Sequence, residues 1–364
     1  MVKAAVMYNF MEPLRVESLK LKAPREDEIV VKLTASGVCH TDLSVVQAKL
    51  PFPPPVVLGH EGAGIVEEVG KGVCDLKPGD HVVLTWVANC GKCHYCVAGS
   101  VHLCEVTNVS ITQGQEAVFE KDGVDIARFV GVGSFAERTV VRATTAIKIR
   151  DDVPLDRACL VGCGVMTGVG AVTNTAKVRP GQTVAVFGCG GVGLNVIQGA
   201  ELCGASRIIA VDLAPAKLAL AKQFGATDTI NAKDAGDVPT AIRSLTDGLG
   251  VDYAFEVVGE PAIITQAYMS LKRGGKVVVV GVPAMGQDVS IPGMMLALEE
   301  KSLIGSLYGS ANFRRDMPLL IDLYMQKRLK IDELVSRRIK IEDVNTAFDA
   351  MEKGEVARSV IVYD

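Results

Sequence analysis

The segment FGCGGVG at residues 187–193 decides the fold of one half of this chain. It matches a GxGxxG pattern, directly follows an apolar β-prone run and directly precedes a helical run at 194–203. In this context Gly188 permits a tight turn, Gly190 lets the backbone approach a pyrophosphate, and Gly193 lets the helix pack closely on the strand. The helix N-terminus then faces the phosphates. The segment therefore predicts dinucleotide binding at a strand-to-helix turn.

An acidic residue, Asp212, closes the next β-prone run, roughly 20 residues after the glycines. A carboxylate there accepts hydrogen bonds from the adenosine ribose and repels a 2'-phosphate, which favours NAD over NADP. In the alternative interpretation the glycines only form a turn and Asp212 caps a surface loop, but strand, helix and acid in this order favour dinucleotide binding. The cofactor-binding candidates here are Gly188, Gly190, Gly191, Val192, Gly193 and Asp212, with Val257, Val280 and Val282 beside later β-prone runs.

Residues 165–307 alternate near-continuous apolar runs with Ala- and Leu-rich helical stretches. The apolar runs lie at 183–187, 207–212, 251–257 and 276–280. Such runs are typical of parallel strands that are covered on both faces and joined by helical crossovers. This half is therefore predicted to be an α/β domain with a Rossmann-type, doubly wound parallel sheet.

Residues 1–164 have a different rhythm, rich in Gly, Pro and short Val-rich runs. The clearest runs lie at 28–33, 64–70 and 81–84. This pattern predicts short strands joined by turns, and so a mainly β domain. Residues 308–364 are expected to return to this first domain. The elements expected there are helices near 314–326 and 341–353 and a last strand at 359–363.

The composition is typical of a globular protein. With 364 residues the chain exceeds one ordinary domain, so two domains are expected. No run reaches the roughly 18 apolar residues that a membrane span needs. The net charge of -4 gives no general attraction for phosphate backbones, so neither nucleic acid nor a membrane is an expected partner. The first residues lack the apolar core of a secretory signal, which predicts a cytoplasmic protein.

Four of the ten cysteines fall within residues 90–104. Cys90, Cys93 and Cys96 recur at CxxCxxC spacing, and Cys104 follows after a short loop. Thiolates at this spacing can face one ion, and four sulfurs complete a tetrahedral zinc shell with no position left for a substrate. The cluster therefore predicts a structural zinc site. A redox-active CxxC pair and buried unliganded cysteines are the alternatives.

Ligand-type residues also occur in three separate segments: CHTD at 39–42, GHEG at 59–62, and Cys163 within VGCG at 161–164. Two thiolates and one imidazole leave a tetrahedral zinc one open position, an arrangement used to polarise an alcohol or aldehyde oxygen. On spacing alone, a lone buried cysteine or a capping histidine is the commoner case.

These motifs occur in the order seen in zinc-containing medium-chain alcohol dehydrogenases: CHTD, GHEG, the four-cysteine loop, Cys163 followed by Thr167-Gly168, and the glycine loop. The chain resembles that family over nearly its whole length. The resemblance implies a GroES-like catalytic domain formed by 1–164 and 308–364, and an NAD-binding domain at 165–307. It also implies hydride transfer between a primary alcohol (aliphatic, allylic or aromatic) or its aldehyde and NAD(H), with one catalytic and one structural zinc per subunit.

By the same resemblance, Cys39, His60 and Cys163 are ligands of the catalytic zinc. Glu61 lies near the metal as a transient ligand. Asp42 orients the imidazole of His60, a partner that zinc-bound histidines generally need.

The resemblance also assigns Thr41 as the acceptor of the alcohol proton. In many family members the relay continues to a histidine three residues later, where this chain has Ser44, so the route beyond Thr41 stays open. Trp86 either lines the substrate pocket or is plain core. His40 stands where many members place an arginine against the pyrophosphate. Further cofactor-binding residues by resemblance are Thr167, Lys217 and Arg358, of which the last two are surface charges in the alternative interpretation.

Two alternatives keep only part of this interpretation. One is a nicotinoprotein-type alcohol dehydrogenase that retains NAD permanently. The other is a zinc-free, NADPH-binding protein similar to quinone reductases, and the zinc ligand residues argue against it.

The apolar segment 302–307 is expected to be an edge strand that family members pair across a two-fold axis, so a homodimer or homotetramer is expected. The small-molecule substrate depends on a pocket shape that the loop at 107–128 does not reveal.

Overall fold

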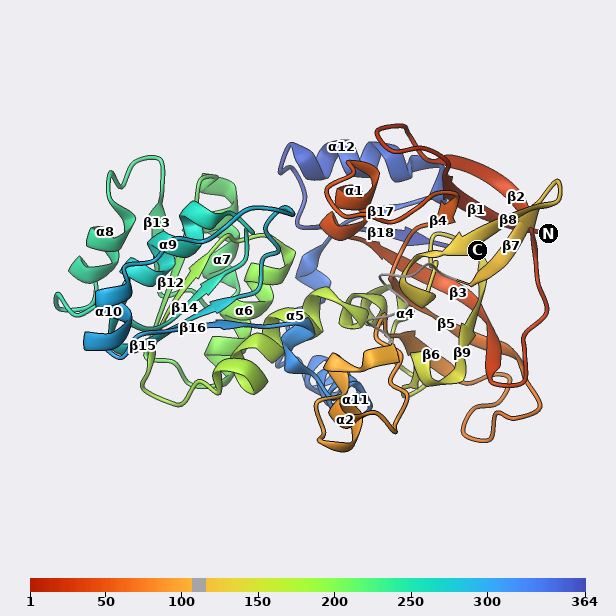
Figure 1. Ribbon diagram of the computed structural model, residues 1–364, viewed down its shortest axis with the longest axis horizontal. Helices are drawn as coiled ribbons and strands as arrows, with labels where there is room; N and C mark the ends of the chain where they lie inside the picture. The colour runs from red at the N-terminus through yellow and green to blue at the C-terminus, as the bar shows by residue number, and fades with distance from the viewer. Residues whose placement is uncertain (107–115) are drawn as a thin grey trace. The chain divides into compact units, whose positions relative to one another are not determined.

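The computed structural model describes residues 1–106 and 116–364. The chain divides into two compact units (Figure 1). The first unit comprises Met1–Cys163 and Asn312–Asp364, and the second comprises Gly164–Ala311. The second unit therefore begins one residue before the nucleotide-binding domain expected from the sequence and ends four residues after it.

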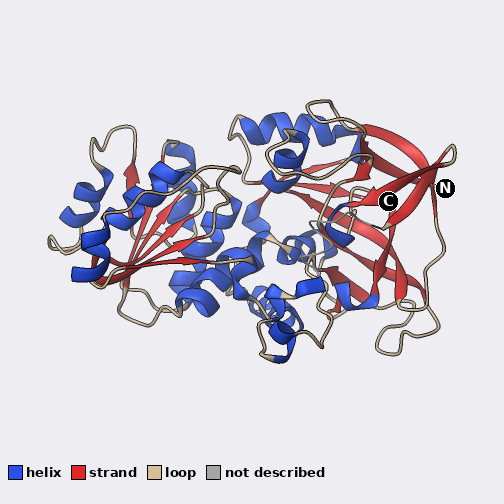
Figure 2. Ribbon diagram, viewed as in Figure 1, coloured by secondary structure: helices blue, strands red, loops and turns tan. Residues whose placement is uncertain are grey.

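The first unit is built around two β-sheets (Figure 2). One is a closed barrel in the order β1-β2-β7-β8-β4, and the other runs β10-β6-β5-β3-β18-β17, with β9 also paired to β3. The barrel strands are β1 (Val2–Met7), β2 (Arg15–Leu21), β4 (Val56–Val57), β7 (Ala117–Lys121) and β8 (Val124–Arg128). The larger sheet contains β3 (Glu28–Val38), β5 (Glu61–Val69), β6 (His81–Leu84), β9 (Arg138–Arg142), β10 (Ala146–Lys148), β17 (Val335–Ile339) and β18 (Arg358–Val362). The predicted mainly β character of this unit is confirmed.

Strand β3 lies at the centre of the larger sheet, and nearly all of its side chains are buried. It pairs antiparallel with β5, β9 and β18. At its C-terminal end, Gly37 pairs with Glu61 of β5, and Val38 pairs with Ser359 of β18. This register brings the segment after β3, the start of β5 and the start of β18 to one end of the sheet.

The helices of the first unit are short except for the two near the C-terminus. The α-helices are α1 (His40–Val46), α2 (His94–Val97), α4 (Leu155–Ala158), α11 (Phe313–Met325) and α12 (Val344–Glu352). The 3-10 helices are η1 (Val101–Leu103), η2 (Phe129–Gly131), η3 (Ala143–Thr145), η4 (Cys159–Gly162), η7 (Asp332–Leu334) and η8 (Ile341–Asp343). Both helices expected after residue 308 are confirmed, although the first three residues of the second one form the 3-10 turn η8.

The second unit contains a six-stranded sheet in the order β13-β12-β11-β14-β15-β16. All of its neighbouring strands are parallel. The strands are β11 (Thr183–Phe187), β12 (Arg207–Asp212), β13 (Asp228–Asn231), β14 (Val251–Glu256), β15 (Leu271–Val279) and β16 (Ser302–Gly305). The predicted parallel sheet is therefore confirmed, and its order reverses between β11 and β14, which makes it doubly wound.

The helices of this unit include α6 to α10, which connect successive strands, and three that lie before β11 or after β16. They are α5 (Gly164–Gly170), the π-helix η5 (Ala171–Ala176), α6 (Gly191–Leu202), α7 (Pro215–Gln223), α8 (Val238–Ser244), α9 (Pro261–Met269), α10 (Gly293–Leu298) and the 3-10 helix η6 (Tyr308–Ser310). Helices α6, α7 and α9 contact the central strands. The core between them is built from buried aliphatic and aromatic residues such as Ile209, Phe187 and Tyr268.

Within the described residues, no single helix combines the length and apolar composition needed to cross a bilayer. One bent pair, Leu155–Gly162 with Gly164–Ala176, reaches both only when its two helices are taken together.

Candidate metal centres and cofactor loop

The four-cysteine loop consists of Cys90, Cys93, Cys96 and Cys104. Its four sulfurs lie within 4.8 Å of one another, and two of the pairs, Cys90–Cys96 and Cys93–Cys104, are 4.0 Å apart. Zinc–sulfur bonds of about 2.3 Å place the ligands of a tetrahedral ion about 3 to 4 Å apart. The sulfurs therefore fit a single zinc ion with a complete sulfur shell.

Backbone amides of the loop support these sulfurs. The Cys93 N–H donates to Cys90 Sγ, and the Cys90 N–H donates to Cys104 Sγ, each at 3.3 Å. Hydrogen bonds from the backbone of Cys96 and Glu105 lower the pKa of Cys93 to about 6. Backbone amides thus favour the thiolate, which is the form that binds a metal.

A second ligand set lies at the end of the larger sheet in the first unit. Cys39 follows β3 and is the N-cap residue of α1, His60 immediately precedes β5, and Cys163 follows η4. Their donor atoms and a carboxylate oxygen of Glu61 lie within 4.8 Å of one another. All four residues are buried, the most exposed being Cys163 at 8%. The three segments that the sequence motifs marked are therefore brought together.

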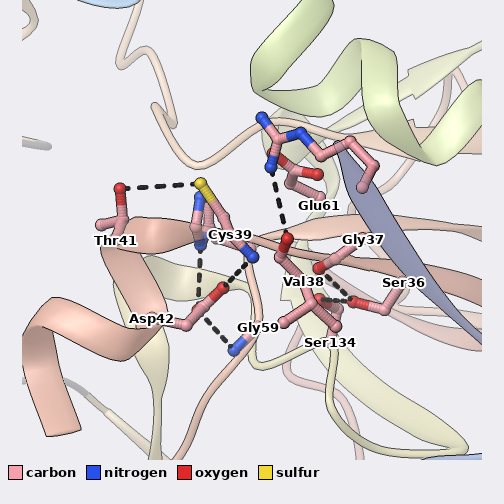
Figure 3. A network of polar contacts seen from close by, with 11 residues as sticks. Ser36, Gly37, Val38, Cys39, Thr41, Asp42, Gly59, Glu61 and Ser134 are labelled. Carbon is pink, nitrogen blue, oxygen red and sulfur yellow. Dashed lines mark hydrogen bonds and ion pairs between the residues drawn. The ribbon is translucent and has the colours of Figure 1, made fainter. Parts of the chain in front are cut away.

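The carboxylate of Asp42 organises this set (Figure 3). Its Oδ1 lies 3.1 Å from Nδ1 of His60 and accepts the N–H of Gly59 at 3.0 Å. Its Oδ2 accepts the N–H of Cys39 at 3.2 Å. One fully buried carboxylate thus fixes the backbone at two ligand segments and turns the other ring nitrogen, Nε2, toward the sulfurs.

Burial and neighbouring groups shift the pKa values of the residues in this set. Burial alone would lower the pKa of His60, but the Asp42 carboxylate and the Cys39 sulfur together raise that pKa. A hydrogen bond between Cys39 and Cys163 lowers the pKa of Cys39 and raises that of Cys163. Burial raises the pKa of Glu61 to about 7, against the opposing effect of the Arg358 guanidinium.

Arg358 is a residue whose surroundings differ from those of an ordinary surface charge. It is 5% exposed, its Nη1 lies 3.2 Å from Oε1 of Glu61, and the same nitrogen donates to the carbonyl of Val38 at 3.3 Å. The ion pair follows from the pairing of β18 with β3 and of β3 with β5. The sequence motifs did not anticipate this pair, and the expected contact of Arg358 with a pyrophosphate stays a prediction.

Other predicted residues of the first unit differ in burial. The Thr41 hydroxyl lies 3.8 Å from the Cys39 sulfur, His40 is exposed, and Ser44 is half-buried on α1. Trp86 is half-buried and packs against the core of the unit. The part of the predicted substrate loop at 107–115 lies outside the described residues.

Sequence reasoning missed Phe129, the first residue of η2. Its ring contacts the His60 ring edge-on, with centroids 5.7 Å apart and planes at 78°. Phe52 packs in turn on Phe129, with centroids 4.9 Å apart. No sequence motif marked either phenylalanine, because a single aromatic residue between turns looks the same in a core and beside a metal ligand.

The glycine loop of the second unit has the expected strand-to-helix form. Gly188 adopts a φ of +96°, which side chains other than glycine rarely adopt. A methyl group at Gly193 would lie 1.9 Å from the Gly188 carbonyl, whereas one at Gly190 would meet no heavy atom of the unit within 4 Å. The loop is thus tight where helix meets strand and open at Gly190, the N-cap residue of α6. This open space fits a dinucleotide phosphate.

Asp212 ends β12 beside this loop. Its Oδ2 accepts the Cys189 N–H at 2.8 Å, and its Oδ1 accepts the Ala214 N–H at 3.0 Å. The carboxylate is therefore held at the edge of the open space. Other cofactor candidates of this unit are half-buried or exposed: Thr167 on α5, Gly191 and Val192 at the start of α6, Lys217 on α7, and Val257, Val280 and Val282 after β14 and β15.

Two family models match the chain. Residues 25–151 match the alcohol dehydrogenase GroES-like domain, and residues 191–326 match the zinc-binding dehydrogenase family. An S-(hydroxymethyl)glutathione dehydrogenase from Synechocystis is 41% identical over 99% of this chain and 99% of that protein. An alcohol dehydrogenase class-3 from Drosophila melanogaster is 40% identical over 99% of this chain and 97% of that protein.

Solved structures agree over the whole chain. The crystal structure of an alcohol dehydrogenase zinc-binding domain protein from Burkholderia ambifaria has a TM-score of 0.95 at 38% identity, covering 100% of this chain and 99% of that one. Benzyl alcohol dehydrogenase from Acinetobacter calcoaceticus has a TM-score of 0.93 at 36% identity, with the same coverage. With donor sets for two zinc ions, one GroES-like and one Rossmann-type unit, and relatives matched from end to end, the chain belongs to the zinc-containing medium-chain alcohol dehydrogenases.

Proposed function

We propose that this chain is a zinc- and NAD-dependent dehydrogenase that oxidises primary alcohols or reduces the matching aldehydes. The buried set of Cys39, His60 and Cys163 carries the proposal, because three donors leave a tetrahedral zinc one position for a substrate oxygen. Bound zinc would supply Lewis acidity that lowers the pKa of the alcohol, and NAD would accept the hydride.

Residues of the chain would position this chemistry and move the proton. Asp42 holds the His60 ring with Nε2 toward the sulfurs, and so keeps the donor set in place. The Thr41 hydroxyl, close to the Cys39 sulfur, is the proposed acceptor of the alcohol proton. A hydroxyl can only relay a proton, so Thr41 would give its own proton to water as it accepts that of the alcohol. Ser44 cannot replace the histidine as the base that ends the relay, because its hydroxyl is not basic near neutral pH. The ion pair with Arg358 holds Glu61 beside the donors as a reserve ligand.

The cofactor half of the proposal depends on Asp212. Hydrogen bonds from two backbone amides fix its carboxylate at the edge of the glycine loop. A fixed negative charge there accepts ribose hydroxyls and repels a 2'-phosphate, so NAD is favoured over NADP.

Initial rates would test the proposal, measured by the absorbance of reduced cofactor with NAD and with NADP. The panel contains short and long aliphatic, allylic and benzylic alcohols, and S-(hydroxymethyl)glutathione, because the relatives include dehydrogenases of that hemithioacetal and of benzyl alcohol. We expect zinc-dependent oxidation of primary alcohols with a kcat/KM at least about tenfold higher for NAD than for NADP. Equal or better rates with NADP would contradict the role of Asp212, and full rates after removal of zinc would contradict the reaction itself.

Purification without added cofactor distinguishes a nicotinoprotein, which keeps its NAD, from an enzyme that exchanges NAD in each turnover. One nucleotide per chain that survives dialysis supports that variant of the proposal, whereas a nucleotide-free protein that binds NAD reversibly supports the exchangeable form. The zinc-free, NADPH-dependent alternative is set aside, because the described residues carry both zinc ligand sets.

We also propose that the chain is a cytoplasmic homo-oligomer. Among the described strands, β16 pairs with β15 alone, and Leu303 on β16 and Leu307 just after it are 37% and 47% exposed. An apolar edge strand of this kind pairs readily with a second copy. Sedimentation should therefore give the mass of a dimer or tetramer, and Leu303→Glu should shift it toward the monomer. The ten cysteines form no disulfide within the described residues, as is usual in a reducing compartment.

A further inference from the structure

A buried carboxylate that the proposed chemistry does not use lies in the second unit. Glu256 is the last residue of β14 and has no exposed surface. Its Oε1 accepts the N–H groups of Val258 and Gly259, each at 2.7 Å. Its Oε2 is buried and has no hydrogen-bond partner among the described residues. Burial raises the pKa of Glu256, although the backbone amides oppose this effect. An acid here is costly, so a role beyond filling space is indicated.

The turn that Glu256 closes is locked to the end of β15. The Glu256 carbonyl accepts the N–H of Val280 at 2.8 Å and that of Gly281 at 3.0 Å. A methyl group at Gly281 would lie 2.2 Å from the Gly259 nitrogen and 2.8 Å from Oε2 of Glu256. A methyl group at Gly259 would lie 2.7 Å from the Val282 carbonyl. The turn at 257–259 and the turn at 280–282 therefore pack backbone against backbone. The Glu256 carboxylate lies beside this contact.

The same turn also touches the glycine loop. The Val257 N–H donates to the Phe187 carbonyl at 3.0 Å, and a methyl group at Gly188 would lie 2.8 Å from Cγ2 of Val258. The carboxylate of Glu256 thus holds a turn at 257–259 that lies between the end of β11 and the end of β15, and contacts both.

These strand ends border the place where a ligand of such a sheet binds. Open α/β sheets bind ligands outside the carboxyl ends of their strands, at the point where the strand order reverses. That point lies between β11 and β14. The half formed by β11, β12 and β13 carries the glycine loop and Asp212, which take the adenosine and the phosphates. The ends of β14 and β15 are left for the other half of the dinucleotide, which carries nicotinamide.

We propose that Glu256 is a positioning residue for the nicotinamide half of the cofactor: Oε1 of its carboxylate fixes the turn at 257–259 against Gly188 on one side and the turn at 280–282 on the other. This inference rests on the proposed use of NAD. In this proposal, cofactor affinity depends on the position of the accepting oxygen Oε1 and not on the negative charge of the carboxylate. Two variants separate these causes. Glu256→Gln keeps an acceptor oxygen at the same reach and removes the charge, whereas Glu256→Asp keeps the charge and withdraws the oxygen by one methylene.

The matched control lies at the other end of the same strand. Oδ2 of Asp252 accepts the N–H and the hydroxyl of Thr183, each at 2.9 Å, and its Oδ1 pairs with Lys272 at 2.6 Å. Asp252→Ala therefore also removes a carboxylate that anchors the backbone of β14, but at the amino ends of the strands, away from the proposed cofactor edge.

The experiment measures the Kd of NADH by fluorescence titration for the full zinc-loaded chain and the three variants, with zinc content and thermal unfolding recorded for each. We expect Glu256→Asp to raise the Kd at least tenfold and to raise the KM for NAD more than it lowers kcat. Glu256→Gln should stay within threefold of the unaltered chain. Asp252→Ala should lower the unfolding temperature but keep the Kd within twofold.

The proposal is overturned if Glu256→Asp binds NADH normally, if Glu256→Gln loses as much affinity as Glu256→Asp, or if Asp252→Ala weakens binding to the same extent. Failure of the unaltered chain to bind NADH is a separate result, which contradicts the proposed cofactor.

Discussion

The two zinc ligand sets differ in how the chain assembles them. The four-cysteine loop draws its ligands from residues 90–104, and the sulfurs accept hydrogen bonds from amides of the same loop. The Cys39–His60–Cys163 set draws them from three distant segments, which meet only because β3 pairs with β5 and η4 packs against both strands. Two of the four loop cysteines are partly exposed, whereas every ligand of the second set is buried.

This difference predicts that one zinc site supports folding and the other supports catalysis. In the four-cysteine loop, all four ligands and the amides that support them belong to one short segment. Zinc bound there would order that segment and so contribute to folding. A set assembled by the fold exists only once the sheet has formed, and its open position is available for chemistry. Removal of one ligand should therefore have a different consequence in each set.

The largest effect is expected for Cys163→Ser. Loss of a thiolate from a three-donor set should release that zinc, lowering the metal content from two ions to one per chain. Because Lewis acidity supplies several kcal/mol, and each 1.36 kcal/mol is tenfold in rate, alcohol oxidation should fall by about a thousandfold or more. Metal analysis and initial rates would check both expectations.

Cys159→Ser is the control for this prediction. Cys159 is fully buried four residues earlier, donates weakly to the Asp156 carbonyl at 3.6 Å and belongs to neither donor set. It should keep both zinc ions and most of the activity. Turnover retained by Cys163→Ser with one zinc missing would refute the assignment of the buried set.

A smaller catalytic effect, with a larger loss of stability, is expected for Cys104→Ser. Its removal opens the sulfur shell of the four-cysteine loop, so one zinc should again be lost. Stability should fall by about 3 kcal/mol, since loss of a structural metal is among the more costly changes. The rate per remaining zinc should stay within about fivefold of the original. Thermal unfolding and metal analysis test this, with the exposed Cys74→Ser, outside both sets, as the control.

Local patterns explain which features could be predicted from the sequence. The CxxCxxC spacing fixes which sulfurs meet, and β6 and β11 have the same bounds as the runs predicted at 81–84 and 183–187. The turn at Gly188 needs a positive φ, and such a requirement is visible in sequence. These features depend on neighbours within a few positions along the chain.

Features that depend on strand register could not be predicted in the same way. The pair of Arg358 with Glu61 needs β18 beside β3 and β3 beside β5, which no motif encodes. The role of Glu256 was equally hidden, although one sign was present: two acids, Asp252 and Glu256, lie within the mostly apolar run at 251–257. A charged residue at the end of a buried strand is rarely accidental.

Asp42→Asn should weaken zinc binding by about 10- to 100-fold, and only in the buried set. The substituted amide offers N–H groups where Oδ2 now accepts the N–H of Cys39, so two donors would face each other. The four-cysteine loop is the internal control, because its supporting donors are backbone amides. Competition with a chromogenic chelator should show one ion lost early and one retained. Equal loss from both sets would contradict the distinction drawn between them.

The smallest effect is expected for Phe129→Leu. The phenyl ring contacts the His60 ring edge-on, and such aromatic contacts are worth about 0.5 to 1.5 kcal/mol beyond the area they bury. Since 1.36 kcal/mol is a factor of ten, zinc affinity at the buried set should fall by about two- to tenfold, less than for Asp42→Asn. The same chelator competition measures it. Phe52→Leu is the matched control, because that ring contacts Phe129 and should affect His60 only indirectly. If Phe129→Leu costs as much as Asp42→Asn, ring packing rather than the carboxylate holds the imidazole in place.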